Sequence, residues 1–231
     1  MKKVSIFFLF FVLSIVFISA YPQDSIIRIG TIGNSITHGV VLPDPSTQSY
    51  PAQLAVMLKE IFGDTVLLKN FGLTTTTMLK KGNVSYWDTQ HLKDYLAFAP
   101  DICVILLGTN DTKPINWDVY GSEYITDYMA LIDTIRLTNP STRFILGYPP
   151  PVFEDRWGIR DSVLVNGVMP AIDSVLTRVD AKLVDFYYPL LKSGHLFPDK
   201  IHPDIEGSKE MAKILLKRLI ETDIVHRAME D

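Results

Sequence analysis

The stretch Ile102-Cys103-Val104-Ile105-Leu106-Leu107 decides the fold more strongly than any other part of the sequence. It is apolar at every position, which is typical of a central strand in a parallel sheet that is covered on both faces. The polar turn Gly108-Thr109-Asn110-Asp111 follows it directly. In an open parallel sheet, ligands bind beyond the carboxyl ends of the strands, so this turn is a candidate part of a functional site.

Similar apolar runs alternate with segments of helical period along the rest of the chain. The expected strands are residues 26–30, 66–68, 102–107, 143–147 and 182–186. The expected helices are residues 50–62, 91–99, 124–137, 162–179 and 205–220, and the fourth of these is interrupted near Gly167 and Pro170. This alternation predicts an α/β fold with right-handed crossovers and a five-stranded parallel sheet that has helices on both faces.

Composition and charge exclude several classes of protein. The 231 residues are 47% hydrophobic and 21% charged, which suits one ordinary globular domain. The formal net charge of −4 argues against a nucleic-acid partner, which would require a clustered basic surface. The single cysteine, Cys103, excludes an intramolecular disulfide and a multi-cysteine metal site, and its place in an apolar strand predicts a core residue.

The first twenty residues have the pattern of a secretory signal peptide. A basic start, Lys2-Lys3, precedes an apolar run over residues 4–18, and Ala20 is a small residue at which a signal peptidase could cut. We therefore expect a signal peptide over residues 1–20, a single domain over residues 21–231, and a periplasmic or extracellular bacterial protein with no stable membrane partner after cleavage. The alternative is an uncleaved anchor, although the run is shorter than the ~20 residues that a spanning helix needs.

Four polar blocks fall at one edge of the predicted sheet. They are Gly33-Asn34-Ser35, Asn70-Phe71-Gly72, Gly108-Thr109-Asn110-Asp111 and Asp199-Lys200-Ile201-His202. Each block by itself could be a turn, a strand exit or a helix cap. Together they contain all the groups that acyl transfer requires, which is the reason to interpret them as one site.

The residue types of these blocks correspond to the roles of a serine hydrolase. Ser35 offers a nucleophile, His202 a general base, and Asp199 a carboxylate that can orient the imidazole and stabilise its protonated form. The N–H of Ser35, the N–H of Gly72 and the side-chain amide of Asn110 would form an oxyanion hole. We assign Asp111 no catalytic role and expect it to hold the turn of residues 108–110.

In these residues the sequence resembles the SGNH (GDSL-type) hydrolases, whose four blocks carry a serine, a glycine, an asparagine and a histidine. The matching residues, in that order, are Ser35, Gly72, Asn110 and His202, and Asp199 matches the family's acid. The resemblance spans roughly residues 26–220. It implies a flavodoxin-like three-layer α/β/α sandwich and an esterase, lipase, thioesterase or carbohydrate O-acetylesterase activity.

One block departs from the commonest family pattern. Asn34 stands where most members have aspartate, and it remains a candidate substrate contact. Since the family's aspartate at this position is not the acid of the triad, Asp199 can keep that role. Thr37 stands where a Gly-x-Ser-x-Gly motif would need its second glycine, which disfavours the nucleophile elbow of the α/β-hydrolase fold.

The loops around the expected site favour a sugar ester as substrate. Aromatic and charged side chains are mixed there, and the candidate substrate contacts besides Asn34 are Trp117, Arg156 and Trp157. The sequence resembles exported bacterial sialate O-acetylesterase-like and carbohydrate acetylesterase members, so removal of acetate from a glycan or small O-acyl ester is the first hypothesis. A short-chain lipase, lysophospholipase or thioesterase is the alternative, followed by an inactive carbohydrate-binding module. Arg156 or Arg160 could pair with a sialic-acid carboxylate.

Metal and phosphate chemistry find little support in the sequence. The histidines lack metal-site spacing, and residues 30–33 lack the lysine of a phosphate-binding loop. We therefore expect no metal and no cofactor. His38 could make a minor contact with substrate from the same loop as Ser35.

Overall fold

The computed structural model describes residues 26–225 and residue 228. The expected signal peptide, residues 1–20, lies outside the described residues. Five parallel strands form one sheet in the order β2-β1-β3-β4-β5. Their bounds are β1 (Ile27–Gly33), β2 (Val66–Gly72), β3 (Ile102–Leu106), β4 (Arg143–Tyr148) and β5 (Ala181–Asp185). The predicted α/β class and the five parallel strands are confirmed.

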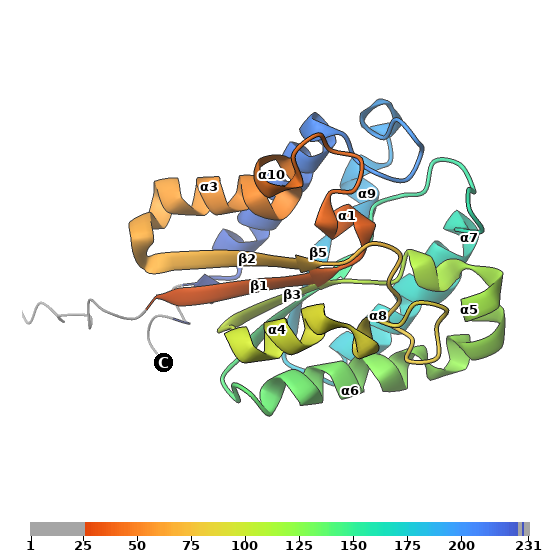
Figure 1. Cartoon of the computed structure of the whole chain (residues 1–231), viewed down its shortest axis with the longest axis horizontal. Coiled ribbons are helices and arrows are strands. Elements are labelled where there is room, and N and C mark those ends of the chain that lie inside the picture. Colours follow the sequence, from red (N-terminus) through yellow and green to blue (C-terminus); the bar gives the residue numbers. More distant parts are fainter. Residues whose placement is uncertain (1–25, 226–227, 229–231) are drawn as a thin grey trace, which may run out of the picture.

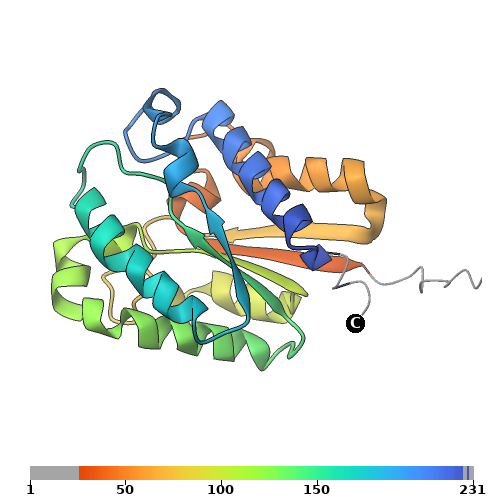
Figure 2. The ribbon, with the colours of Figure 1, turned by 180° about the vertical axis from the view of Figure 1, so that it is seen from behind.

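Helices cover both faces of the sheet and complete the expected three layers (Figures 1 and 2). One face carries α3 (Tyr50–Phe62) and α10 (Ile205–Glu221), whose apolar residues form one buried cluster with the sheet. The other face carries α4 (Gln90–Phe98), α6 (Tyr124–Arg136) and α8 (Met169–Leu176), which form a second cluster. β3 is buried along its whole length because it lies between both clusters.

The strand register brings the expected functional blocks to one edge. Gly33 at the end of β1 pairs with Gly72 of β2 on one side and with Leu106 of β3 on the other. The chain therefore leaves three neighbouring strands at the same level. Five short helices lie in the segments that follow the strands. They are α1 (Ser35–His38), α2 (Pro45–Gln48), α5 (Pro114–Tyr120), α7 (Asp161–Val163) and α9 (Tyr187–Leu190).

The helix expected over residues 162–179 is interrupted as predicted. Residues 164–168 form a π-helical turn between α7 and α8, and Pro170 lies in the first turn of α8. A Cβ at Gly167 would lie 2.5 Å from the ring of Trp117, so glycine lets α5 pack directly against this turn. Helix α5 itself was not predicted from the sequence, because it is only seven residues long and follows a polar turn.

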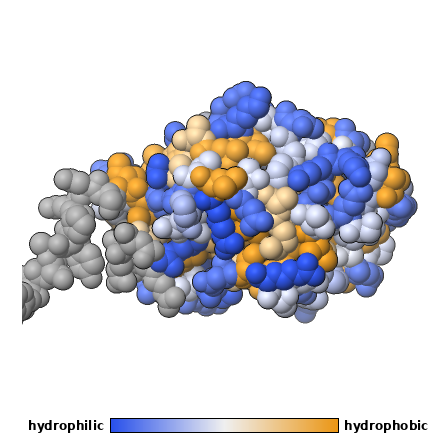
Figure 3. Space-filling model, turned by 90° about the horizontal axis from the view of Figure 1, so that it is seen from below, coloured by the Kyte–Doolittle hydropathy of each residue, from blue (hydrophilic) through white to orange (hydrophobic). Residues whose placement is uncertain are grey.

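The surface below the sheet in Figure 1 mixes hydrophilic and hydrophobic residues (Figure 3). In the described part of the chain, every helix is either too short or too polar to cross a bilayer.

Candidate active site

Ser35 begins the short helix α1 directly after β1. The Asn34 side chain caps this helix by accepting a hydrogen bond from the Ile36 N–H at 3.0 Å. A Cβ at Gly33 would lie 1.9 Å from Thr37 Oγ1, so a glycine is needed where β1 turns into α1. Ser35 is therefore held at the N-terminus of α1 by its own neighbours, at the carboxyl edge of the sheet.

His202 and Asp199 lie in the segment between α9 and α10. Two apolar side chains fix this segment: Phe197 is buried in the cluster with α3 and α10, and Ile201 in the cluster on the opposite face. Lys200 between them has a left-handed backbone conformation with φ of 73°. The segment thus passes over the end of the sheet with both ends anchored in the core.

The structure joins Ser35, His202 and Asp199 in one chain of hydrogen bonds. Ser35 Oγ lies 2.8 Å from His202 Nε2, and His202 Nδ1 lies 2.7 Å from Asp199 Oδ2. Since the carboxylate can only accept when ionised, Nδ1 carries the proton and Nε2 is free to accept the proton of the serine hydroxyl. Residues 35 and 202 come from opposite ends of the domain, and only the fold brings them into contact.

Hydrogen bonds keep the Asp199 carboxyl ionised. Its Oδ1 accepts the backbone N–H groups of Ile201 at 3.0 Å and His202 at 2.7 Å. Burial acts to raise the pKa of Asp199, but these two N–H groups and the His202 ring outweigh it, so the pKa lies below its ordinary value. The carboxylate is therefore negative at neutral pH and can stabilise a protonated imidazole.

Asn110 lies in the turn after β3 and is buried. Its side-chain Nδ2 donates to the Thr76 backbone carbonyl at 3.2 Å. Its backbone carbonyl accepts a hydrogen bond from Asn116 Nδ2 at 2.8 Å. A side-chain amide carries two N–H bonds, so one remains available for a ligand after the bond to Thr76. The strand register places this turn beside the start of α1, on the strand next to β1.

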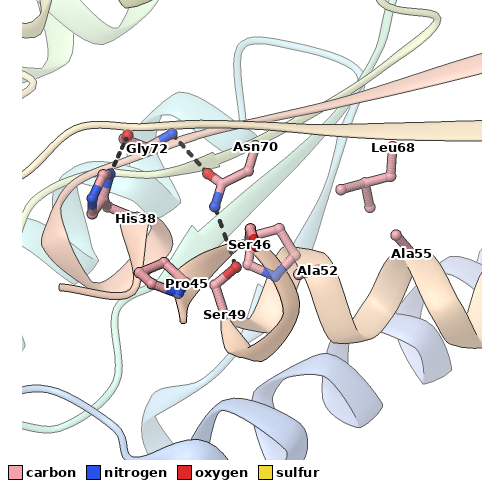
Figure 4. A pocket seen from close by; sticks show the side chains of 10 residues that line it. His38, Pro45, Ser46, Ser49, Ala52, Ala55, Leu68, Asn70 and Gly72 are labelled. Carbon is pink, nitrogen blue, oxygen red and sulfur yellow. Dashed lines mark hydrogen bonds between the residues drawn. The ribbon is translucent and has the colours of Figure 1, made fainter. Parts of the chain in front are cut away.

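Gly72 differs from its expected role as an oxyanion donor. Its N–H donates to Asn70 Oδ1 at 2.8 Å, and its carbonyl lies 3.2 Å from His38 Nδ1 (Figure 4). A Cβ at this position would lie 2.4 Å from His38 N. Glycine is needed here because the end of β2 packs against the backbone of α1, and its N–H is already used. The assignment of Gly72 to the oxyanion hole is therefore corrected.

The pocket shown in Figure 4 lies next to the contact between Gly72 and His38, between β2 and the start of α3. Its volume is about 350 Å³. The Asn70 amide spans it by donating to the Thr37 carbonyl at 2.7 Å and to Ser49 Oγ at 3.4 Å. The half-buried His38 borders the pocket through the ring that bonds Gly72. These bonds tie β2, α1 and α3 together and support the helix that carries Ser35.

Thr75 is a residue at this edge that the sequence did not indicate. It has a φ of 65°, which is rare for a β-branched residue and frequent at functional sites. It directly precedes Thr76, whose carbonyl binds the Asn110 amide. The run Thr74-Thr75-Thr76-Thr77 contains no glycine or asparagine that would mark a left-handed turn, so no local signal could have found it.

Two of the expected substrate contacts lie beside His202. The Trp157 ring centroid is 6.0 Å from that of His202, and the Arg156 guanidinium lies 4.6 Å from the Trp157 centroid. Arg156 Nη1 also contacts the Asp199 carbonyl at 3.5 Å. Trp157 is 55% exposed although it is a large aromatic residue, so much of its surface is open to a ligand.

Three other residues that we expected to contact substrate interact with the rest of the protein instead. Asn34 is buried as the cap of α1. Trp117 packs against Gly167, Gly121 and the Tyr124 ring, so its face is used by the fold. Arg160 pairs with Asp118 at 2.6 Å and donates to the Thr112 carbonyl at 2.8 Å. The expectation that Asn34 and Trp117 contact substrate is therefore corrected. The expectation that Arg160 is free to pair with a substrate carboxylate is corrected as well.

Two remaining features concern the single cysteine and metal binding. Cys103 is buried in β3, where burial raises the pKa of its thiol to about 12, as suits a core residue. Among residues 26–225, histidine, cysteine, aspartate and glutamate side chains form no group of three that could hold a metal ion.

A parallel α/β/α sheet with a linked serine, histidine and aspartate at its carboxyl edge defines the class of flavodoxin-like serine hydrolases. Residues 31–209 match the GDSL-like Lipase/Acylhydrolase family, and the chain belongs to that family. The matched region contains Ser35, Asn110, Asp199 and His202.

Comparison with individual proteins gives one close sequence relative and several structures of the same fold. The chain is 36% identical over 212 residues to an acetylxylan esterase of Xylanibacter ruminicola, with 84% of this chain and 43% of the relative covered. The chain thus spans less than half the length of that relative. An acetylxylan esterase from Geobacillus stearothermophilus has a TM-score of 0.60 at 22% identity, covering 84% of this chain and 94% of the other. A member of the lipolytic G-D-S-L family from Veillonella parvula has a TM-score of 0.61 at 18% identity, covering 83% and 97%.

Proposed function

We propose that the protein is a serine esterase that removes acetyl groups from O-acetylated carbohydrates. The observation that carries this proposal is the chain of hydrogen bonds from Ser35 Oγ through the His202 ring to Asp199, at 2.8 and 2.7 Å. The substrate class is supported by the acetylxylan esterase that is 36% identical to this chain. The pairing of an exposed tryptophan and an arginine beside His202 also suits a sugar, which has apolar ring faces and polar edges.

The proposed reaction has two steps. Ser35 Oγ attacks the acetyl carbonyl carbon while His202 Nε2 takes the hydroxyl proton. The tetrahedral intermediate then collapses, and the sugar oxygen leaves with the proton from His202, so that an acetyl-serine remains. A water molecule next gives its proton to His202 and attacks this ester, which releases acetate and restores the Ser35 hydroxyl. Asp199 stays ionised in both steps and stabilises the protonated imidazole.

The negative charge of each intermediate falls on the former carbonyl oxygen. We assign the free Asn110 N–H and the Ser35 N–H to this oxygen. The third donor in this proposal is the N–H of Thr75, which replaces Gly72. Two observations support it: Thr75 has a left-handed backbone, and its neighbour Thr76 is bonded to the Asn110 amide.

We also propose that the protein is exported and acts in the periplasm or outside a bacterial cell. The basic start, the apolar run and Ala20 support cleavage of a signal peptide after residue 20, which would leave a hydrolase domain over residues 21–231 without a membrane partner. Acetylated polysaccharides are too large to enter the cytoplasm, so export would bring the enzyme to such a substrate.

Acetate release tests this function directly. The purified protein is incubated with acetylated xylan, O-acetylated sialic acid and p-nitrophenyl esters of two to eight carbons. We expect release of acetate from the polysaccharide and the fastest aryl ester turnover with acetate. Ser35→Ala should lower kcat by about 10⁴-fold or more, whereas Ser46→Ala, on an exposed serine of α2, should have no effect. Preference for the eight-carbon ester would favour a lipase, and unchanged turnover in Ser35→Ala would remove the nucleophile.

A further inference from the structure

The loop of residues 73–85, between β2 and the turn that precedes α4, is held by side chains from other elements. Little regular structure is present in it, yet its backbone groups are paired with buried polar residues of the β3 exit, α5 and α6. These residues are Asn110, Asp111, Asn116 and Asp127. All four are at most 5% exposed, and the bonds that Asn110 and Asp111 make to the loop are buried.

Asp111 makes the central contact to this loop. Its Oδ2 accepts the Met78 N–H at 3.0 Å and its Oδ1 accepts the Leu79 N–H at 2.9 Å. Asp127 on α6 accepts the next N–H, that of Lys80, at 2.8 Å. Two carboxyl groups therefore hold three successive backbone N–H groups. This differs from the expectation that Asp111 holds the turn of residues 108–110.

The same loop contributes to the proposed oxyanion hole. Asn110, the neighbour of Asp111, donates to the Thr76 carbonyl, two residues before Met78. The left-handed Thr75 lies immediately before that carbonyl. Asn110 and Asp111 thus bind neighbouring residues of one loop. A shift of residues 78–79 would move Thr76, and the Asn110 amide that bonds its carbonyl would move with it.

A completely buried carboxyl is unusual in a protein. Asp111 has 0% exposure, and burial raises its pKa to about 7, although the N–H groups of Leu79 and Met78 act to lower it. A carboxyl that served only to fill space would be less stable there than an apolar residue of similar size. The two oxygens of Asp111 each accept a backbone N–H, which accounts for a carboxyl at this position.

We propose that Asp111 is a positioning residue for catalysis: it holds residues 75–79 against the end of β3, so that the Asn110 amide and the Thr75 N–H face the same substrate oxygen. This inference rests on the proposed esterase function. Asp111 itself does not contact the reacting atoms.

The test compares Asp111→Asn with Asp127→Asn. Asparagine keeps the shape, but its NH2 group cannot accept, so Asp111→Asn leaves Met78 or Leu79 N–H unpaired. Asp127→Asn keeps an oxygen that can accept the single Lys80 N–H, so it controls for the loss of a carboxyl charge farther along the loop from Thr76. With p-nitrophenyl acetate, we expect Asp111→Asn to lower kcat by about 30-fold with KM within twofold, because small displacements of catalytic groups cost up to about 10²-fold. Asp127→Asn should leave kcat within about threefold.

Other outcomes separate the possible failures. Equal kcat losses in both variants, in proportion to their loss of Tm, would show that Asp111 serves stability alone and would overturn the inference. Wild-type activity that survives in Ser35→Ala would instead remove the esterase function itself. If Asp111→Asn does not fold, hydrogen exchange in the wild-type protein decides: the Met78 and Leu79 amides should exchange as slowly as those of β3, and fast exchange would contradict the clamp.

Discussion

The loop of residues 73–85 and the loop of residues 149–161 both border the site, but they are held in place differently. The first, which we call the oxyanion wall, is fixed by buried carboxyl and amide groups of Asn110, Asp111, Asn116 and Asp127. The second, the outer wall, carries Arg156 and the exposed Trp157 at its tip, where Arg156 and Ile159 form an isolated bridge, and its Val152 and Ile159 are buried among apolar residues. The tip of the outer wall, residues 154–158, is therefore exposed, although residues on both sides of it are anchored in the core.

This difference suits the two tasks of the proposed enzyme. Donors that stabilise a developing charge are effective only if they are already oriented before the reaction, which requires a rigid, buried support. Side chains that bind a variable glycan act from the surface, and loops of this kind tolerate change. Substitutions in the oxyanion wall should therefore lower kcat, whereas those in the outer wall should raise KM.

The largest effect is expected at His202, which lies outside both walls, bonds Ser35 and faces Trp157 of the outer wall. His202→Ala removes the group that takes the Ser35 proton and also the ring that faces Trp157. We expect kcat for p-nitrophenyl acetate to fall by about 10⁴–10⁶-fold with an unchanged circular dichroism spectrum. The control is His195→Ala, on an exposed histidine of the same segment. A loss below tenfold would mean that another group takes the proton.

Asn110→Ala should give the next largest effect and tests the oxyanion wall alone. Loss of one oxyanion donor typically lowers kcat by about 10²–10³-fold. KM should change little, because the contact strengthens only in the transition state. Asn166→Ala, on an exposed residue bonded only to the Ser162 carbonyl, is the matched control. A change confined to KM would assign Asn110 to substrate binding and would abolish the contrast between the walls.

Trp157→Ala should have a smaller effect, of the opposite kind. We expect KM for acetylated xylan to rise by about 3- to 10-fold, since an aromatic contact is worth about 0.5–1.5 kcal/mol. Turnover of p-nitrophenyl acetate should stay within about twofold. Trp87→Phe, at a tryptophan that bonds the Met78 carbonyl within the oxyanion wall, should instead alter kcat. Equal loss with both substrates in Trp157→Ala would contradict a glycan contact.

The last prediction concerns the stability of the protein rather than its turnover. The unfolded Asp111 carboxyl loses its proton near its ordinary pKa of 3.8, whereas the folded one retains it up to about pH 7. Between these values the folded state binds more protons, so Asp111 makes the protein less stable as pH rises from about 4 to 7. Asp127, Lys113 and Tyr124 are the ionisable groups that share this electrostatic environment.

Urea unfolding at pH 5 and pH 7 measures this contribution. The decline in unfolding free energy between the two pH values should be smaller in Asp111→Asn than in the wild type. Asp199 has the opposite sign, because its lowered pKa adds stability that is lost only as pH falls below its ordinary range. An unchanged decline in Asp111→Asn would mean that the folded Asp111 carboxyl titrates near its ordinary pKa.

Much of the fold could be predicted because its signals are local. The apolar run of residues 102–107 predicted the central strand, observed as Ile102–Leu106. Gly63 correctly marked the end of α3, and Gly167 with Pro170 correctly marked the interruption before α8. The first two strands extend farther than predicted, because their last residues pair within the sheet although they are polar or glycine.

The site was predicted less evenly. Ser35, Asp199 and His202 have the residue types of a hydrolase, and the parallel topology predicts that their segments meet at one edge. Gly72 and Thr75 could not be distinguished, because the difference lies in where one N–H points and in one backbone angle. Trp117 and Trp157 have the same composition signal, but one packs on Gly167 and the other faces solvent.

The sequence by itself determined the order of strands and helices and supplied the chemical groups of the site, because periodicity and side-chain chemistry act over a few neighbouring residues. Only the tertiary structure decided which groups meet and which are free. The bonds between Ser35 and His202, 167 residues apart, and between Asp111 and Met78, 33 residues apart, depend on the packing of the whole sheet. Distances of this kind arise from the sum of many weak contacts, which no single stretch of sequence contains.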